Sequence, residues 1–156
     1  MRWFCKLLLL LALTPSAQAV MSGNDEPPQA GAPATPYQQG VAAHLDENWS
    51  DVIRFMAEAI AEQPWNDDAH NLIGHAYRKL GDYDQSLDHY QTALQLNPYH
   101  RGALEYLGEA YLEMGRINDA RHLLDRLEQE CRRLFADNWK AECEEWQDLD
   151  EAFTDR

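Results

Sequence analysis

The chain has 156 residues, of which 45% are hydrophobic and 10% aromatic, so it suits one globular domain and is too short for a multidomain enzyme. It carries 27 Asp and Glu against 13 Lys and Arg, a formal net charge of -14. This charge argues against nucleic acids and anionic membranes as partners, because binding to phosphates requires Lys and Arg in place of counterions. We therefore expect a neutral or basic partner.

The N-terminal residues 1–19 have the pattern of a cleavable signal peptide. Two basic residues precede an apolar run from Leu7 to Leu13, and the segment ends in Ala17-Gln18-Ala19, with small residues at the cleavage positions. The alternative is a membrane anchor, but a spanning helix needs ~20 apolar residues and this run is far shorter. Cys5 precedes the run, away from the cleavage point where a lipoprotein cysteine lies. We therefore expect export without stable membrane anchoring.

Residues 20–40 have the composition of a disordered, Pro-rich linker. Four of the seven prolines lie in this segment, and it has little aliphatic bulk. Such a segment buries too little apolar surface to offset the entropy lost on ordering. The sequence therefore predicts that the folded region begins at Val41.

The region after the linker contains an internal repeat. The repeat interval is the spacing from Pro64 to Pro98, and the sequence between these prolines has helical periodicity. A shift by this interval aligns three pairs of identical residues: Gly74 with Gly108, Tyr77 with Tyr111, and Gly81 with Gly115. A glycine permits two helices to approach closely, and a glycine just past a helical run adopts the left-handed conformation at little cost. The pattern predicts repeated helical hairpins.

These residues resemble a tetratricopeptide repeat, a two-helix unit whose length is the same as this interval. Residues 67–100 match the family pattern closely, whereas residues 101–134 have Leu127 where the family prefers a small residue and Arg132 in place of the closing Pro. A third, upstream unit is half visible through Trp49, Val52, Met56, Ala59 and Pro64. The resemblance implies an all-α protein, a short right-handed α-solenoid with its repeat domain over residues 41–136. The alternative, a plain helical bundle, needs no fixed period.

Residues 137–156 are predicted to form a capping helix, because one apolar stripe recurs at spacings of three and four. The stripe consists of Trp139, Cys143, Trp146, Leu149 and Phe153. Cys131 and Cys143 are the two cysteines that remain after signal removal, and an even number in an exported protein predicts a disulfide. The alternative is a pair of buried free thiols.

The sequence shows no pattern for catalysis or for a cofactor. It lacks HExxH, a nucleophile elbow and a phosphate-cradling glycine loop, and its six histidines are scattered. We therefore predict no enzymatic activity, no cofactor and no metal site.

The resemblance places seven side chains in the concave groove that such repeats form. They are Asn71, His75, Lys79, Glu105, Tyr106, Glu109 and Glu113. The three glutamates among them are spaced i, i+4, i+8, where like charges oppose the helix. Some family members grip a partner's terminal carboxylate with Lys, Arg and Asn, but only Asn71 could do so here. The interpretation is an acidic groove for a basic or neutral protein segment; the alternative is a solvated face with no ligand.

The sequence thus favours a non-catalytic scaffold or adaptor for protein–protein interaction, exported to the bacterial periplasm, with secretion as the alternative. A different hypothesis is a metal or thiol-redox accessory protein that uses the histidines, the acidic residues and the cysteine pair. Nucleic acid is not expected as a partner, and the oligomeric state and the partner's identity are not predicted.

Overall fold

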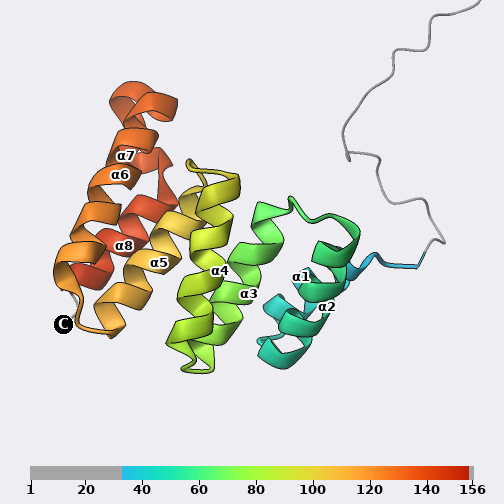
Figure 1. Ribbon diagram of the computed structural model, residues 1–156. Coiled ribbons are helices and arrows are strands. Elements are labelled where there is room, and N and C mark those ends of the chain that lie inside the picture. Colours follow the sequence, from blue (N-terminus) through green and yellow to red (C-terminus); the bar gives the residue numbers. More distant parts are fainter. Residues whose placement is uncertain (1–32, 155–156) are drawn as a thin grey trace, which may run out of the picture. The chain divides into compact units, whose positions relative to one another are not determined.

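A computed structural model describes residues 33–154 (Figure 1). The predicted signal peptide, residues 1–19, and most of the predicted linker lie outside the described residues. Within residues 33–154 every regular element is a helix and no strand is present, so the all-α solenoid prediction is confirmed.

The described residues form three helical hairpins followed by a C-terminal segment. The hairpins are α1 (Pro36–Leu45) with α2 (Trp49–Glu62), α3 (Asp67–Lys79) with α4 (Tyr83–Leu96), and α5 (Arg101–Glu113) with α6 (Ile117–Phe135). The C-terminal segment consists of a 3-10 turn η1 (Ala136–Asn138), α7 (Trp139–Glu142) and α8 (Glu144–Thr154).

All three hairpins keep the same repeat register, including the one that the sequence showed only in part. The turn inside each hairpin contains a residue with positive φ, which is 53° at Glu47, 81° at Gly81 and 74° at Gly115. The helix that follows starts after Asn48, Asp82 or Arg116, which are again separated by the repeat interval. The first hairpin was obscured in the sequence because a glutamate occupies the turn position that is glycine in the other two.

The folded region begins earlier than predicted, because α1 starts at Pro36 and residues 36–40 are helical. The Thr35 hydroxyl accepts a hydrogen bond from the Gln38 backbone N–H (3.2 Å), and the Gln38 side chain accepts one from the Thr35 N–H (3.0 Å). Pro36 occupies the first turn, where its missing N–H costs nothing. Here proline starts a helix, so a composition rule that treats proline as a breaker placed the boundary at residue 41 instead.

A glycine at each first helix allows close packing against a large neighbour. A Cβ at Gly74 would lie 2.7 Å from Cδ1 of Tyr90, and one at Gly40 would lie 2.7 Å from Cε of Met56. A Cβ at Gly108 would lie 2.6 Å from Cδ2 of Leu149 on α8. These contacts lie within two buried apolar clusters, one among α1–α3 and one extending from α4 to α8.

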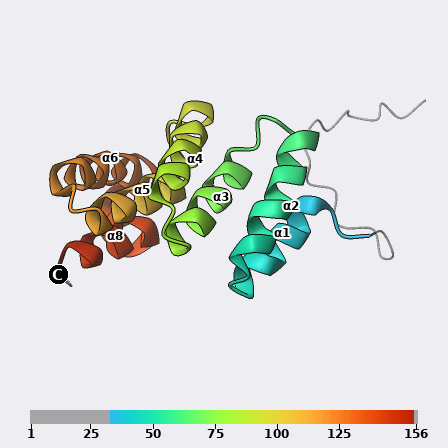
Figure 2. The ribbon, with the colours of Figure 1, turned by 60° about the horizontal axis from the view of Figure 1, so that its bottom comes forward.

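The helices form two layers with different contacts. α3 packs against both α1 and α5, and α5 packs against α8, whereas within residues 33–154 no Cα atom of α2, α4 or α6 lies within 8 Å of a Cα atom of another of these three helices. Figure 2 shows α5 between α6 and α8. In a curved stack of hairpins, the equivalent helices that lie closer together are on the inner side. We therefore call α1, α3, α5 and α8 the inner layer, and α2, α4 and α6 the outer layer.

The predicted capping helix over residues 137–156 is divided in the structure. α6 ends at Phe135, the next residue Ala136 has a φ of 49°, and Cys143 separates α7 from α8 with φ -109° and ψ 90°. Cys131 and Cys143 form a disulfide with their Cα atoms 5.8 Å apart, and both side chains are fully buried. The bridge joins α6 to the start of α8. The amphipathic pattern indicated a helix but could not show that the bridge interrupts it.

Replacing Gly74 with alanine should destabilise the protein by about 1–3 kcal/mol, because the new methyl group overlaps the Tyr90 ring. Gly81→Ala is the matched control: nothing lies within 4 Å of its Cβ, and only the positive φ opposes the substitution, at about 1 kcal/mol. Urea unfolding of both variants measures the difference. Equal stability of Gly74→Ala and wild type would contradict the close approach.

Removing the disulfide should release the C-terminal helices before the repeats unfold. The loop closed by the bridge spans 12 residues in sequence, so its chain-entropy contribution is about 3 kcal/mol. In Cys131→Ala/Cys143→Ala, amide hydrogen exchange should become faster in α8 while α3 and α4 keep the protection of wild type. Uniformly faster exchange through all helices would instead mean that the bridge stabilises the whole stack.

Candidate functional site

The inner layer contains all seven residues of the predicted groove. α3 contributes Asn71, His75 and Lys79, and α5 contributes Glu105, Tyr106, Glu109 and Glu113. They differ in exposure: Lys79 and Glu113 are exposed, Tyr106 and Glu109 are half-buried, and Asn71, His75 and Glu105 are buried. The buried three lie at the contact between helices, so only a small part of each is open to a ligand.

Arg78, which sequence reasoning did not select, links two of the glutamates. Its Nη2 lies 2.6 Å from Oε2 of Glu109, and its Nη1 lies 2.7 Å from Oε1 of Glu113, with 8% of the arginine side chain exposed. The protein itself therefore supplies the positive charge that offsets the repulsion of these glutamates. A basic partner segment is therefore not required to offset the repulsion between Glu109 and Glu113. Arg78 precedes Glu113 by roughly one repeat interval, and that spacing was the available signal.

Glu105 has no basic partner of this kind within the described residues. Its side chain lies in the α5 face toward α8, and only 7% of the residue is exposed. Burial raises the pKa of Glu105 to about 8, and the carboxylates of Glu109, Asp148 and Glu145 raise it further against the opposing effect of Arg78. Glu105 is therefore mostly protonated at neutral pH.

α8 adds two acidic residues, Glu145 and Asp148, to this part of the inner layer. Glu145 pairs with Arg101 (Oε1 to Nε, 3.1 Å), whereas Asp148 is exposed and has no ion pair within residues 33–154. Both carboxylates act on Glu105, because the packing of Leu149 against Gly108 brings α8 against α5. We call Glu105, Glu109, Glu145 and Asp148 the acidic cluster. No sequence signal showed which helix α8 would contact.

His75 lies among aromatic rings at the contact of α1, α3 and α5. Its Nδ1 is 2.8 Å from Nε2 of His44, and its ring centroid is 4.4 Å from that of Tyr106 and 5.3 Å from that of Trp49. Burial lowers the pKa of His75 to about 3, assisted by the charges of Arg78, His44 and Lys79. The neutral ring is therefore part of the packing, and its contribution to stability is lost as pH falls from about 6.5 toward 3.

Asn71 is buried between α3 and α5. A Cβ at Gly102 would lie 3.3 Å from the Nδ2 atom of Asn71. The Oδ1 atom of Asn71 has no hydrogen-bond partner within the described residues. Lys79 reaches outward, with Nζ 6.0 Å from the centroid of the Trp49 ring. The carboxylate clamp considered from the family resemblance is therefore not assembled here, since Asn71, the residue that could contribute to it, faces Gly102.

The described residues give no support to the metal or thiol-redox alternative. Within residues 33–154 no group of three or more His, Cys, Asp and Glu side chains has the geometry to hold a metal ion. Both cysteines of the pair are in the buried disulfide. No helix in the described part of the chain is both long and apolar enough to cross a membrane.

Comparison with protein-family models identifies the repeats of this chain. The model described as tetratricopeptide repeat matches residues 67–100, and a second model with the same description matches residues 103–131. The chain is a tetratricopeptide repeat protein. The two matches coincide with the second and third hairpins, and the repeats support a protein–protein interaction scaffold. A search of curated proteins finds no significant match.

Solved structures with the same fold include several repeat domains. The TPR2B domain of yeast Sti1, in a complex with pHsp70, has a TM-score of 0.66 at 16% identity and covers 78% of this chain and 95% of its own. The TPR domain of Arabidopsis OM64 has a TM-score of 0.64 at 15% identity, covering 77% and 92%. A crystal structure of MamA has a TM-score of 0.59 at 21% identity, covers 63% of this chain, and is itself covered over 57% of its length. These likenesses show the fold.

Replacing Glu105 with glutamine should stabilise the protein increasingly as pH rises from about 4.5 to about 8. In this interval the unfolded chain releases the Glu105 proton while the folded protein retains it, so wild type loses about 1.4 kcal/mol per pH unit from this group. Glutamine has no proton to release, and the contribution of His75 cancels in the difference between the two proteins. Urea unfolding from pH 4 to pH 8 measures that difference. A constant value would show that Glu105 titrates normally.

Proposed function

We propose that this tetratricopeptide repeat protein is an exported, non-catalytic scaffold of the bacterial periplasm that binds a protein segment along its inner layer. The acidic cluster is the observation that carries the proposal, because it leaves Asp148 unpaired beside a buried Glu105. The solved yeast Sti1 domain is a complex with pHsp70, which supports a protein segment as the kind of ligand. The absence of a carboxylate clamp among residues 33–154 and the acidic charge argue for a different ligand chemistry in this chain.

A lysine side chain or an amino terminus is the group that fits the acidic cluster. Placing a cation beside Asp148 would favour the ionised form of Glu105, since an opposite charge within a few ångströms lowers the pKa of a carboxyl group. Two carboxylates would then face one ammonium group, with the half-buried Tyr106 ring beside them as an apolar or cation-attracting surface. Binding should therefore release a proton at neutral pH, which a solvated face with no ligand would not do.

Two features support export. The sequence of residues 1–19 has the pattern of a signal peptide, which we propose is removed before Val20. Cys131 and Cys143 form a buried disulfide, and such bridges persist in oxidising compartments. The segment from residue 20 to the start of α1 is proposed to be a tether.

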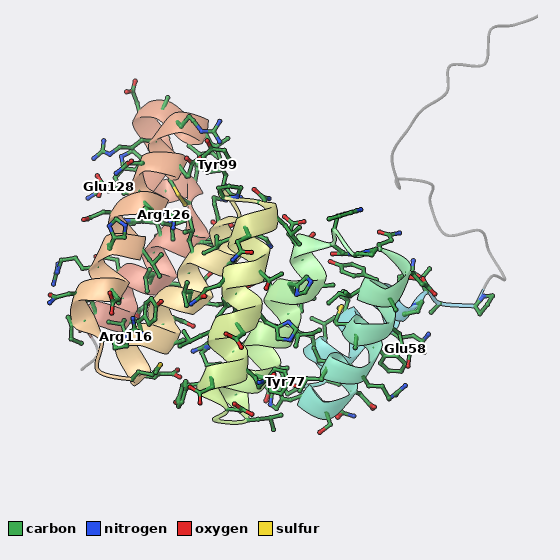
Figure 3. The ribbon with its side chains drawn as sticks, in the orientation of Figure 1. Glu58, Tyr77, Tyr99, Arg116, Arg126 and Glu128 are labelled. Carbon is green, nitrogen blue, oxygen red and sulfur yellow. A yellow bond between two sulfur atoms is a disulfide. The ribbon has the colours of Figure 1, made fainter. Side chains whose placement is uncertain are left out.

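The test is capture of partners from periplasmic extract, followed by affinity measurement with the purified partner at two salt concentrations. Glu105→Gln/Asp148→Asn should bind about tenfold more weakly at low salt, and the difference should shrink at high salt. Glu58→Gln is the matched control, because Glu58 is an exposed acid on α2 of the outer layer and pairs with Arg54 (Figure 3). Equal affinity of wild type, the double variant and Glu58→Gln would show that the acidic cluster is a solvated face that binds no partner.

A further inference from the structure

A groove lies in the outer layer between α4 and α6. The Cα atoms of these two helices stay more than 8 Å apart, and α5 forms the floor of a hollow of about 370 Å³ between them. The floor and walls are apolar, formed by Leu94, Leu107, Tyr111 and Leu123. The rim is polar, formed by Gln91, Gln95, Asp119, His122 and Arg126. We call this the outer groove.

Arg126 stands at the junction of the outer groove with a second hollow of about 180 Å³. That hollow includes Tyr99, 62% exposed, from the turn between α4 and α5. Figure 3 shows Arg126 on α6 and Tyr99 at the same end of the molecule. The two hollows together offer an apolar path with one arginine between them.

The unpaired charge of this path is positive, although the chain as a whole carries -14. Asp119 is paired with Arg116 at 2.8 Å, and Glu130 of the second hollow is paired with Arg133 at 2.7 Å. Arg126 donates from Nη2 to the backbone oxygen of Pro98 at 3.1 Å and has no carboxylate within 4.0 Å among residues 33–154. Its remaining N–H groups are available to an acceptor from outside the chain.

The repeat register shows that this charge is not required for packing. One repeat interval before Arg126 lies Thr92, and one repeat interval before His122 lies Asp88. At this equivalent position on α4, the Thr92 hydroxyl donates a hydrogen bond to the backbone oxygen of Asp88 at 2.9 Å. Two positions that are neutral or acidic in one repeat are therefore arginine and histidine in the next, on the same fold.

We propose that the outer groove is a second docking surface, which binds a partner segment that carries a carboxylate beside an apolar side chain. The apolar side chain rests over Leu94, Leu107 and Leu123, and the carboxylate accepts hydrogen bonds from Arg126, whose planar guanidinium matches a carboxylate in two-point contact. The ligand chemistry is the opposite of that proposed for the inner layer. The two surfaces lie on opposite layers, so one chain can hold an acidic and a basic segment together.

The test uses a phage-displayed library of short random peptides selected against the purified, disulfide-bonded full chain. Enriched peptides should contain an Asp or Glu next to an aliphatic or aromatic residue. Titration of such a peptide into isotope-labelled protein should shift the amide signals of the outer groove and leave those of α1 unchanged. Failure to enrich any peptide, or enrichment of peptides without carboxylates, would overturn the proposal.

Substitutions distinguish binding in the outer groove from a general effect of charge on peptide binding. Arg126→Glu should weaken the selected peptide by about tenfold or more, as expected for a lost charge-assisted hydrogen bond. Gln91→Trp should do the same by filling the hollow from an exposed rim position. Arg121→Glu is the control, because this substitution makes the same charge change on α6 away from the outer groove. Arg121 lies over Phe153 of α8, 5.1 Å from the centroid of that ring. Enrichment of basic peptides that shift α5 and α8 would overturn the outer groove while supporting the inner surface.

Discussion

The close approach of helices at glycine organises the stack. Gly40, Gly74 and Gly108 recur at the repeat interval, and each meets a bulky side chain where any Cβ would overlap it. At Gly40 and Gly74 the contact brings together the two helices of one hairpin, and at Gly108 it brings α8 against α5. The second kind of contact places the acidic residues of α8 near Glu105, and α5 also forms the floor of the outer groove.

Buried charge within the inner layer determines which groups are available to a ligand. Arg78 is held between two glutamates from the next repeat, and removal of both glutamates would leave the charge of the buried arginine without compensation. The three glutamates of α5 therefore differ: Glu109 and Glu113 join two repeats, whereas Glu105 makes no ion pair among the described residues. In the proposed site, Asp148 of α8 stands beside Glu105 of α5, so that the site needs both helices. The contacts between repeats and the proposed ligand contact would then use neighbouring residues of the same helix.

The hairpins could be predicted from sequence because repetition records packing directly: a residue needed at one interface recurs at the next, as Tyr77 and Tyr111 do. The start at Pro36 could not, because proline breaks a helix in its interior but suits its first turn, and composition does not distinguish these positions. The role of Arg78 depends on a contact across repeats, and the place of α8 depends on where the disulfide turns the chain. Family position names the helix of a groove residue but not how deeply the residue is buried, so it could not show that Glu105 is buried while Glu113 is exposed.

The two surfaces differ in how protons affect them. Glu105 carries a proton at neutral pH in the free protein, so a cation that binds the acidic cluster must also shift that equilibrium, and its affinity should rise with pH up to about 8. In the outer groove the proposed contact is made by the Arg126 guanidinium instead of a carboxyl group. The inner surface would therefore release a basic partner in acid, because the carboxylate that holds this partner takes up a proton there.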